Sequence, residues 1–211
     1  MTNNSVVLIT GGLTGIGRAA AVAFAKGGAQ VVVAGRREDA GKERVAELRS
    51  LGSEAEFVPA DVRREDDVRA LVDKTVERFG RLDVAVNAAG SEGRPGPIVD
   101  QTAESYAATF DTNVFGLILS MKHEVRVMQK QGRGSIINIS STYGHKGTAA
   151  APLYAGSKHA VEGITKSVAL EMAKSGIRVN AVADAIVFLA SDEASFITGD
   201  ILNVDGGKTA N

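Results

Sequence analysis

Short runs of β-branched and other apolar residues alternate along this chain with longer segments in which apolar residues recur every three or four positions. Several short runs are apolar at nearly every position, which is typical of strands in a parallel sheet that helices cover on both faces. The short runs predict strands over Val6–Thr10, Val31–Ala34, Ala55–Pro59, Leu82–Asn87, Ser135–Ser140, Ile177–Val182 and Ile201–Val204. The longer segments predict helices over Gly15–Gly28, Glu38–Leu51, Glu65–Phe79, Ala103–Gln131, Ala151–Ser175 and Asp184–Ala194.

The order of these segments predicts the topology. Strand and helix alternate regularly, and right-handed crossovers between parallel strands produce a doubly wound sheet. The chain has 211 residues, a length that favours one domain. We therefore predict an α/β fold in a single domain over residues 1–211, with a doubly wound, Rossmann-type, seven-stranded parallel sheet and helices on both of its faces.

Composition argues against several classes of function. The formal net charge of −1 gives no electrostatic basis for binding nucleic acid or an anionic membrane. The chain has no cysteine, which excludes disulfides and thiolate chemistry, and its three histidines lack a metal-ligand spacing, so we expect no metal site. Its N-terminus does not resemble a signal peptide, and no run reaches the ~20 apolar residues of a membrane span. We expect a soluble, cytoplasmic protein.

A glycine-rich turn follows the first predicted strand. Its sequence TGGLTGIG places glycines at positions 11, 15 and 17, directly before a predicted helix. Glycine lets backbone N–H groups approach a pyrophosphate, and the helix N-terminus adds a partial positive charge. We predict that this turn binds a dinucleotide through Gly11, Leu13, Thr14, Gly15, Ile16 and Gly17. The alternative is a turn that needs glycine only for close packing.

The spacing of this turn introduces a family resemblance. TGxxxGIG is followed in order by NAAG at residues 87–90, by Asn113, by Ser141 and by a Y-x-x-x-K formed by Tyr154 and Lys158. This ordered set resembles the short-chain dehydrogenase/reductase family, and the similarity extends from Val6 to Gly207. The resemblance implies a catalytic set of Asn113, Ser141, Tyr154 and Lys158. It also implies coenzyme contacts from Asn87, Ala88, Ala89, Gly90, Tyr154 and Lys158.

Tyr154 and Lys158 also make chemical sense as a pair. Residues four apart on a helix lie one turn apart on the same face. A nearby ammonium favours the phenolate, so we expect Lys158 to lower the pKa of Tyr154. Tyr154 would then serve as general acid in reduction and general base in oxidation. The resemblance places the serine that holds the reacting oxygen at Ser141 rather than Ser140, and it gives Asn113 a helix distortion and a water link to Lys158.

The end of the second predicted strand bears on the choice of coenzyme. Arg36 and Arg37 follow it, and no acidic residue stands where an NAD site would use one to bind the ribose. Arginine suits the 2′-phosphate, so we favour NADP over NAD. Thr14 stands where many NADP-using relatives have a basic residue, and both arginines could instead be ordinary surface charges. Asp61 and Val62 match the pair that contacts adenine in the family, although Asp61 could also cap the next helix.

The resemblance also exposes a missing segment. In the family, the sixth strand is followed by a Pro-Gly turn, a mobile segment that covers the substrate, and then a helix. Here the strand runs almost directly into the predicted helix, and the substrate lid is absent between Ala183 and Asp184. Either this sequence omits a disordered lid, or the protein lacks one. We favour omission, because the residues on both sides are otherwise intact.

These observations lead to one main hypothesis about function. We predict an NADP(H)-dependent oxidoreductase that interconverts a small-molecule secondary alcohol and ketone, with Tyr154 as general acid/base. The resemblance further implies a homotetramer. The alternative is a non-catalytic NAD(P)-binding regulator or redox sensor, which would need Gly11, Gly15 and Gly17 but neither Tyr154 nor Lys158.

Overall fold

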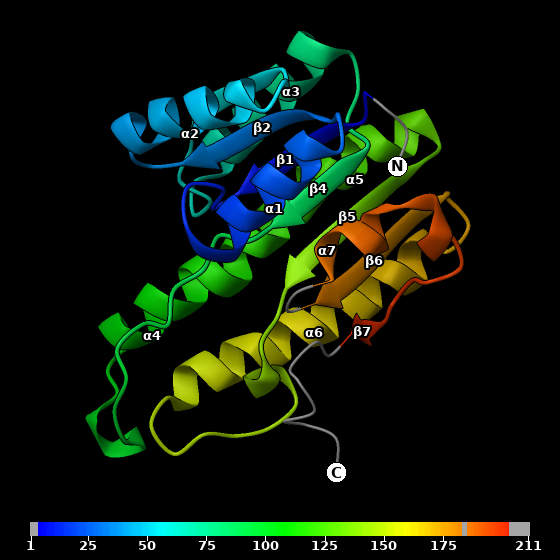
Figure 1. Ribbon diagram of the computed structural model, residues 1–211. Helices are drawn as coiled ribbons and strands as arrows, with labels where there is room; N and C mark the ends of the chain where they lie inside the picture. The colour runs from blue at the N-terminus through cyan, green and yellow to red at the C-terminus, as the bar shows by residue number, and fades with distance from the viewer. Residues whose placement is uncertain (1–3, 183–184, 203–211) are drawn as a thin grey trace.

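In the computed structural model, the described residues are 4–182 and 185–202, and they form one parallel sheet with helices on both faces (Figure 1). Within these residues the sheet has seven strands in the order β3-β2-β1-β4-β5-β6-β7. Their bounds are Val6–Thr10 for β1, Gln30–Gly35 for β2, Ala55–Pro59 for β3, Val84–Asn87 for β4, Gly134–Ile139 for β5, Ile177–Val182 for β6 and Ile201–Leu202 for β7. The predicted fold class is confirmed.

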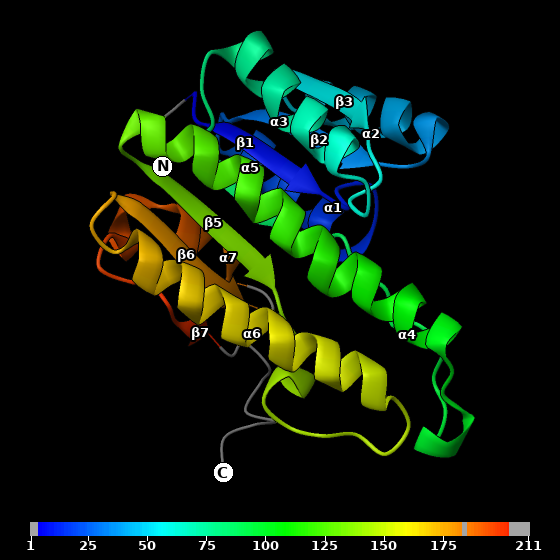
Figure 2. The same ribbon diagram turned by 180° about the vertical axis from the view of Figure 1, so that it is seen from behind.

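Side chains alternate between the two faces of the sheet and build two cores. Val7 and Ile9 of β1 pack with α1 (Gly15–Lys26), whereas Leu8, between them, packs on the opposite face. Helices α1, α2 (Glu38–Ser50) and α7 (Ile186–Ala190) cover the first face in Figure 1. Helices α3 (Glu65–Phe79), α5 (Gly116–Gln131) and α6 (Pro152–Met172) cover the second, as Figure 2 shows. Each fully buried aliphatic side chain contributes roughly 1.5–3 kcal/mol.

The long helix predicted over Ala103–Gln131 is not one regular helix. It consists of α4 (Ala103–Phe110), a π-helical turn over Asp111–Phe115, and α5. Gly116, the first residue of α5, lies so close to the segment after β3 that a Cβ there would be 2.7 Å from Cγ2 of Val62. The helical periodicity continues through the turn, so the apolar pattern could not reveal this change in hydrogen bonding.

The helix predicted over Asp184–Ala194 is also interrupted. Within the described residues it comprises α7 and a 3₁₀ turn over Asp192–Ala194, separated by Ser191 in an extended conformation. The Ser191 hydroxyl donates to the carbonyl of Phe188 at 2.7 Å, and the Arg178 guanidinium donates to the carbonyls of Leu189 and Ser191. These bonds end α7 early. The expected lid junction between Ala183 and Asp184, and the predicted end of the last strand at 203–204, lie outside the described residues.

The remaining differences are small shifts at element ends. β4 begins at Val84 rather than Leu82, β5 covers Gly134–Ile139 rather than Ser135–Ser140, and β2 gains one residue at each end. Each of the helices α1, α2 and α6 is shorter than predicted, by two, one and four residues respectively. The strand order reverses between β1 and β4, and ligands of doubly wound sheets bind at the carboxyl ends of strands at such a point.

Candidate active site

A cavity of about 550 Å³ opens at this reversal point. Most of the predicted coenzyme residues line it, from five separate segments: Gly11, Leu13, Thr14, Gly15, Ile16, Gly17, Arg36, Arg37, Asp61, Val62, Ala88, Ala89, Gly90, Tyr154 and Lys158. Thr10, Ser91, Glu92, Thr112 and Ile139 line it too and were not predicted. The structure therefore brings the separated motifs of the sequence to one hollow.

The positions of the first turn need glycine for different physical reasons. A Cβ on Gly17 would lie 2.4 Å from the carbonyl oxygen of Gly11, and a Cβ on Gly11 would lie 2.7 Å from the backbone of Ala88 and Ala89. Both glycines are thus required by close packing. Gly15 has a φ of +53°, and no described atom lies within 4 Å of the position its Cβ would take. It faces open space where a ligand can approach the backbone.

Asn87 lies behind the cavity rather than in its wall. Its side-chain amide donates to the Glu124 carboxylate and to the Asn138 side-chain oxygen, both at 3.0 Å. Asn138 in turn donates to the Thr165 hydroxyl at 3.0 Å. Asn87 borders only a small second cavity beside Lys158. Its side chain thus joins β4 to α5, β5 and α6, and it is placed for structure rather than for direct contact with a ligand in the main cavity.

Glu124 is the buried charge that sequence analysis missed. It is 1% exposed, and burial raises its pKa to about 7, while the hydrogen bond from Asn87 acts in the opposite direction. A signal for it exists in the sequence. Leu117 and Met121 lie seven and three residues before Glu124, and Met128 lies four residues after it, so all four share one helical face of α5. An acid within such an apolar stripe predicts a buried carboxyl group.

Tyr154 and Lys158 lie together on the first turns of α6 at the edge of the cavity. The Lys158 Nζ is 5.7 Å from the centre of the Tyr154 ring and donates to the carbonyl of Ile139 at 2.7 Å. Burial lowers the pKa of Lys158 to about 8. Tyr154 and Lys158 therefore lie on one face of α6, as predicted.

The predicted effect of Lys158 on the acidity of Tyr154 is wrong for the protein chain by itself. Burial raises the pKa of Tyr154, a hydrogen bond with Ser141 lowers it, and the charges of Glu92 and Tyr143 raise it further. The ammonium of Lys158 is turned to Ile139, and its distance from the ring weakens its effect on the phenol. In the protein chain by itself, burial therefore outweighs the groups that lower the pKa of Tyr154.

The two serines after β5 have separate partners. Ser140 is buried, and its hydroxyl donates to the Glu162 carboxylate at 2.8 Å. Ser141 is the hydrogen-bond partner of Tyr154, and its hydroxyl also accepts from the backbone N–H of Tyr143 at 3.2 Å. Ser140, not Ser141, lines the main cavity. The hydroxyl of Ser140 is committed to Glu162, so Ser141 is the serine of this pair that meets the Tyr154 hydroxyl.

Asn113 occupies the π-helical turn and ties two segments together. Its side-chain oxygen accepts from the backbone N–H of Ser91 at 2.7 Å, and its amide donates to the carbonyl of Ser91 and to the hydroxyl of Ser157. The residue after the NAAG sequence is therefore fixed to α6, on the turn of helix that also carries Lys158. Asn113 borders the small cavity beside Lys158 but not the main one.

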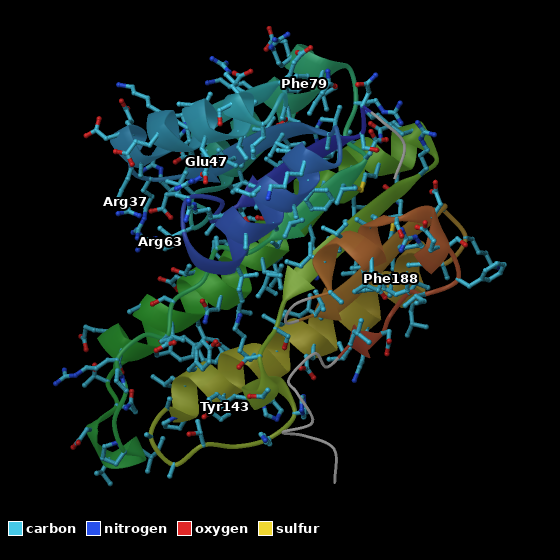
Figure 3. All side chains as sticks on the ribbon, viewed as in Figure 1. Arg37, Glu47, Arg63, Phe79, Tyr143 and Phe188 are labelled. Carbon is cyan, nitrogen blue, oxygen red and sulfur yellow. The ribbon has the colours of Figure 1, made fainter. Side chains whose placement is uncertain are left out.

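Arg36 and Arg37 line the cavity, and a third arginine, Arg63, is bonded to Asp61 in its wall. Arg36 and Arg37 are exposed, and neither makes an ion pair within 4 Å with a described residue. The Arg63 guanidinium pairs with the Asp61 carboxylate at 2.5 Å and, with a smaller effect from Arg36, lowers the pKa of that carboxyl. Figure 3 shows Arg37 and Arg63 on the same side of the molecule. Arg63 thus competes for the carboxylate that we expected to accept from adenine.

Across residues 4–182 and 185–202, no helix has the length and apolar character needed to cross a membrane. In the same ranges, His, Asp and Glu side chains do not gather in groups of three or more that could hold a metal ion.

Comparison with known proteins places this arrangement among oxidoreductases. A sequence model of the family described as "short chain dehydrogenase" matches residues 5–194, and one described as "Enoyl-(Acyl carrier protein) reductase" matches residues 181–209. (+)-Borneol dehydrogenase 2 of Salvia officinalis is 38% identical over 253 positions, covering 97% of this chain and 89% of that protein. Xanthoxin dehydrogenase of Arabidopsis thaliana is 38% identical over 254 positions, with the same coverage. Both alignments exceed the 211 residues of this chain, so each relative has residues without a counterpart here.

Solved structures share the fold over nearly their whole length. Levodione reductase superimposes with a TM-score of 0.96 at 30% identity and covers 100% of this chain and 99% of its own. An actinorhodin polyketide ketoreductase with NADPH gives 0.93 at 31% identity, with 97% of each chain covered. NAD⁺-bound xylitol dehydrogenase gives 0.95 at 27% identity and covers 98% of this chain and 100% of its own. These neighbours thus include both an NADPH and an NAD⁺ complex.

Proposed function

The chain belongs to the short-chain dehydrogenase/reductase family, and on that premise we propose that it interconverts a secondary alcohol and a ketone with NADP(H) as coenzyme. One observation carries the proposal: Tyr154 and Lys158 meet on one face of α6 at the edge of the cavity that the glycine turn borders. A non-catalytic regulator would have no use for this pair.

The cavity fits a dinucleotide. Gly15 offers open backbone at the start of α1, where a pyrophosphate would meet the helix N-terminus. Arg36 and Arg37 have no carboxylate partner among described residues, so their guanidinium groups are available to a 2′-phosphate. Lys158 uses one of its three N–H donors on Ile139, and the other two can bind a ribose hydroxyl. The coenzyme supplies or accepts the hydride.

The protein's own residues handle the proton. Tyr154 donates the proton from its hydroxyl to the carbonyl oxygen during reduction and removes it from the alcohol during oxidation. Ser141 donates a hydrogen bond to the same oxygen and holds it beside Tyr154. The Lys158 ammonium, together with the positive charge of an oxidised nicotinamide, would offset the burial that raises the pKa of Tyr154. Asn113 keeps Ser91 and α6 in register around this site.

The substrate and the assembly are further parts of the proposal. The relatives' names mention borneol and xanthoxin, so borneol is a reasonable first alcohol to assay. We also propose that the protein acts in the cytoplasm as a homotetramer, and that a substrate lid follows β6 in the complete protein.

Purified protein tests the proposal when it is titrated with NADP⁺ and with NAD⁺ and then assayed for nicotinamide reduction with a panel of secondary alcohols. We expect saturable NADP⁺ binding, weaker NAD⁺ binding, and turnover with at least one alcohol. Binding of both coenzymes without turnover of any alcohol, or of any ketone in the reverse direction, would favour the regulator instead.

A further inference from the structure

Two charged side chains of α6 hold the end of β5 immediately before Ser141. Lys158 donates to the carbonyl of Ile139 at 2.7 Å. Glu162, one helical turn further on, accepts from the hydroxyl of Ser140 at 2.8 Å. The Glu162 residue is 6% exposed, so this hydrogen bond is shielded from water. Helix α6 is therefore bonded to two consecutive residues of the segment that leads into Ser141.

Glu162 also contacts the 3₁₀ turn Thr142–Gly144, which lies between Ser141 and His145. The Nδ1 atom of His145 lies 3.6 Å from the same carboxylate oxygen that accepts from Ser140. Gly144 packs so closely on Glu162 that a Cβ at this position would overlap the carboxylate. The carboxylate thus contacts the turn on both sides of Ser141.

The turn itself is compact. The backbone N–H of Gly144 donates to the carbonyl of Ser141 at 2.8 Å, and the backbone N–H of Tyr143 donates to its hydroxyl at 3.2 Å. The Tyr143 ring lies edge-on to the Tyr154 ring, with 6.4 Å between ring centres. Figure 3 shows Tyr143 on the segment that leads into α6. Whatever fixes this turn therefore fixes both Ser141 and an aromatic wall beside Tyr154.

Glu162 does not act as the counter-ion of Lys158. The two side chains are one helical turn apart and opposite in charge, yet no ion pair within 4 Å joins these two described residues. Burial alone accounts for the lowered pKa of Lys158. The partners of the carboxylate are Ser140 and the following turn, so its effect on chemistry must pass through the position of that turn.

We propose that Glu162 is a positioning residue, whose carboxylate anchors the Ser140–His145 turn to α6 and thereby sets the Ser141 hydroxyl against Tyr154. This inference rests on the proposed function, because Ser141 and Tyr154 are its reacting pair. The role of Glu162 has no local signature in the sequence, because its partner Ser140 lies 22 residues earlier in the chain.

Two substitutions at Glu162 distinguish its role as a hydrogen-bond acceptor from the space that its side chain fills. Glu162→Gln keeps an oxygen that can accept from Ser140, whereas Glu162→Met fills similar space without an acceptor. We expect E162M to lower kcat by about ten- to a hundredfold through misplacement of the Ser141 hydroxyl. E162Q should retain most of the turnover and the wild-type pH profile. NADP⁺ affinity should stay within about twofold in both variants, because the glycine turn is untouched.

Ser140→Ala removes the same hydrogen bond from its other end and leaves the Glu162 side chain in place. We expect S140A to resemble E162M, and the double variant to be no worse than the poorer single variant, because both remove one interaction. Wild-type kcat in S140A would overturn the proposal, even if E162M failed to fold. Equal losses of kcat in E162Q and E162M, together with a displaced pH profile, would also overturn the proposal. They would show that the charge of Glu162 matters, rather than its ability to accept a hydrogen bond from Ser140.

A measurement that needs no activity keeps this inference distinct from the proposed function. Hydrogen–deuterium exchange should be about tenfold faster at the amides of Tyr143 and Gly144 in E162M and S140A, and close to wild type in E162Q. Unchanged exchange in S140A would refute the anchoring role. If the wild-type protein shows no turnover, the proposed function fails, whereas the exchange result still decides whether Glu162 anchors the turn.

Discussion

Glu124→Gln should change how the stability of this protein depends on pH. The carboxyl group is enclosed between α5 and the sheet, where the Asn87 amide is its hydrogen-bond donor at 3.0 Å. Glutamine keeps an oxygen that can accept from Asn87 and removes the ionisable group. The substitution therefore tests the buried charge while keeping the polar network among Asn87, Asn138 and Thr165.

The magnitude follows from the pKa of Glu124, which burial raises from 4.5 to about 7. Below the lower value the group is protonated in the folded and the unfolded chain. Between the two values the unfolded chain has released its proton and the folded chain has kept it, so stability falls as pH rises. The loss of unfolding free energy is complete above about pH 7. It amounts to about 3 kcal/mol, because each unit of difference between the two pKa values contributes ~1.4 kcal/mol.

Urea denaturation of both proteins at pH 5 and at pH 8.5 measures this contribution. The wild type should lose about 2–3 kcal/mol more than E124Q between the two pH values. Comparing the two pH dependences cancels titrations elsewhere in the chain and any fixed cost of the glutamine. Parallel pH dependences for the two proteins would refute the reasoning, because they would mean that Glu124 ionises in the folded protein as freely as in the unfolded one.

Three further predictions concern coenzyme binding, packing and chain length. Arg36→Ala combined with Arg37→Ala should weaken NADP⁺ binding by about tenfold or more and leave NAD⁺ binding within about threefold, as measured by calorimetry; equal losses for both coenzymes would contradict the proposed 2′-phosphate site. Gly17→Ala should lower the Tm and weaken coenzyme binding because its Cβ would overlap the Gly11 carbonyl, whereas the control Gly163→Ala, which meets no described atom within 4 Å, should leave both unchanged or raise the Tm; no difference between the two variants would contradict the packing argument. Intact-mass measurement of protein from its natural source should give a value well above the 21.9 kDa of this sequence if a lid has been omitted, and 21.9 kDa would show that the lid is truly absent.

Elements whose structure depends on local pattern could be predicted from the sequence. The run Val31–Val33 must be a strand because three successive β-branched residues suit a buried pleated surface, and the structure buries all three. The pairing of Tyr154 with Lys158 depends only on helical geometry, since four residues make about one turn. For the same reason, the glycine turn could be located from its position between a strand and a helix.

What remained hidden depends on contacts between distant parts of the chain. Ser140 and Glu162 are 22 residues apart, and Asn87 and Glu124 are 37 apart, so neither hydrogen bond has a local signature. The acidity of Tyr154 was misjudged because the spacing on α6 says nothing about burial or about where the Lys158 ammonium points. Charge effects depend on the folded structure, and so does the early end of α7, where Arg178 bonds the carbonyls of Leu189 and Ser191.

Tyr154→Phe tests the central claim most directly, because the substitution removes one hydroxyl and keeps the ring. NADP⁺ binding by calorimetry and turnover of a substrate alcohol should be measured on the same preparations of wild type and variant. We predict an unchanged dissociation constant and a fall in kcat of about a hundred- to ten-thousandfold. Near-normal turnover in the variant would contradict the assignment of Tyr154 as the general acid/base.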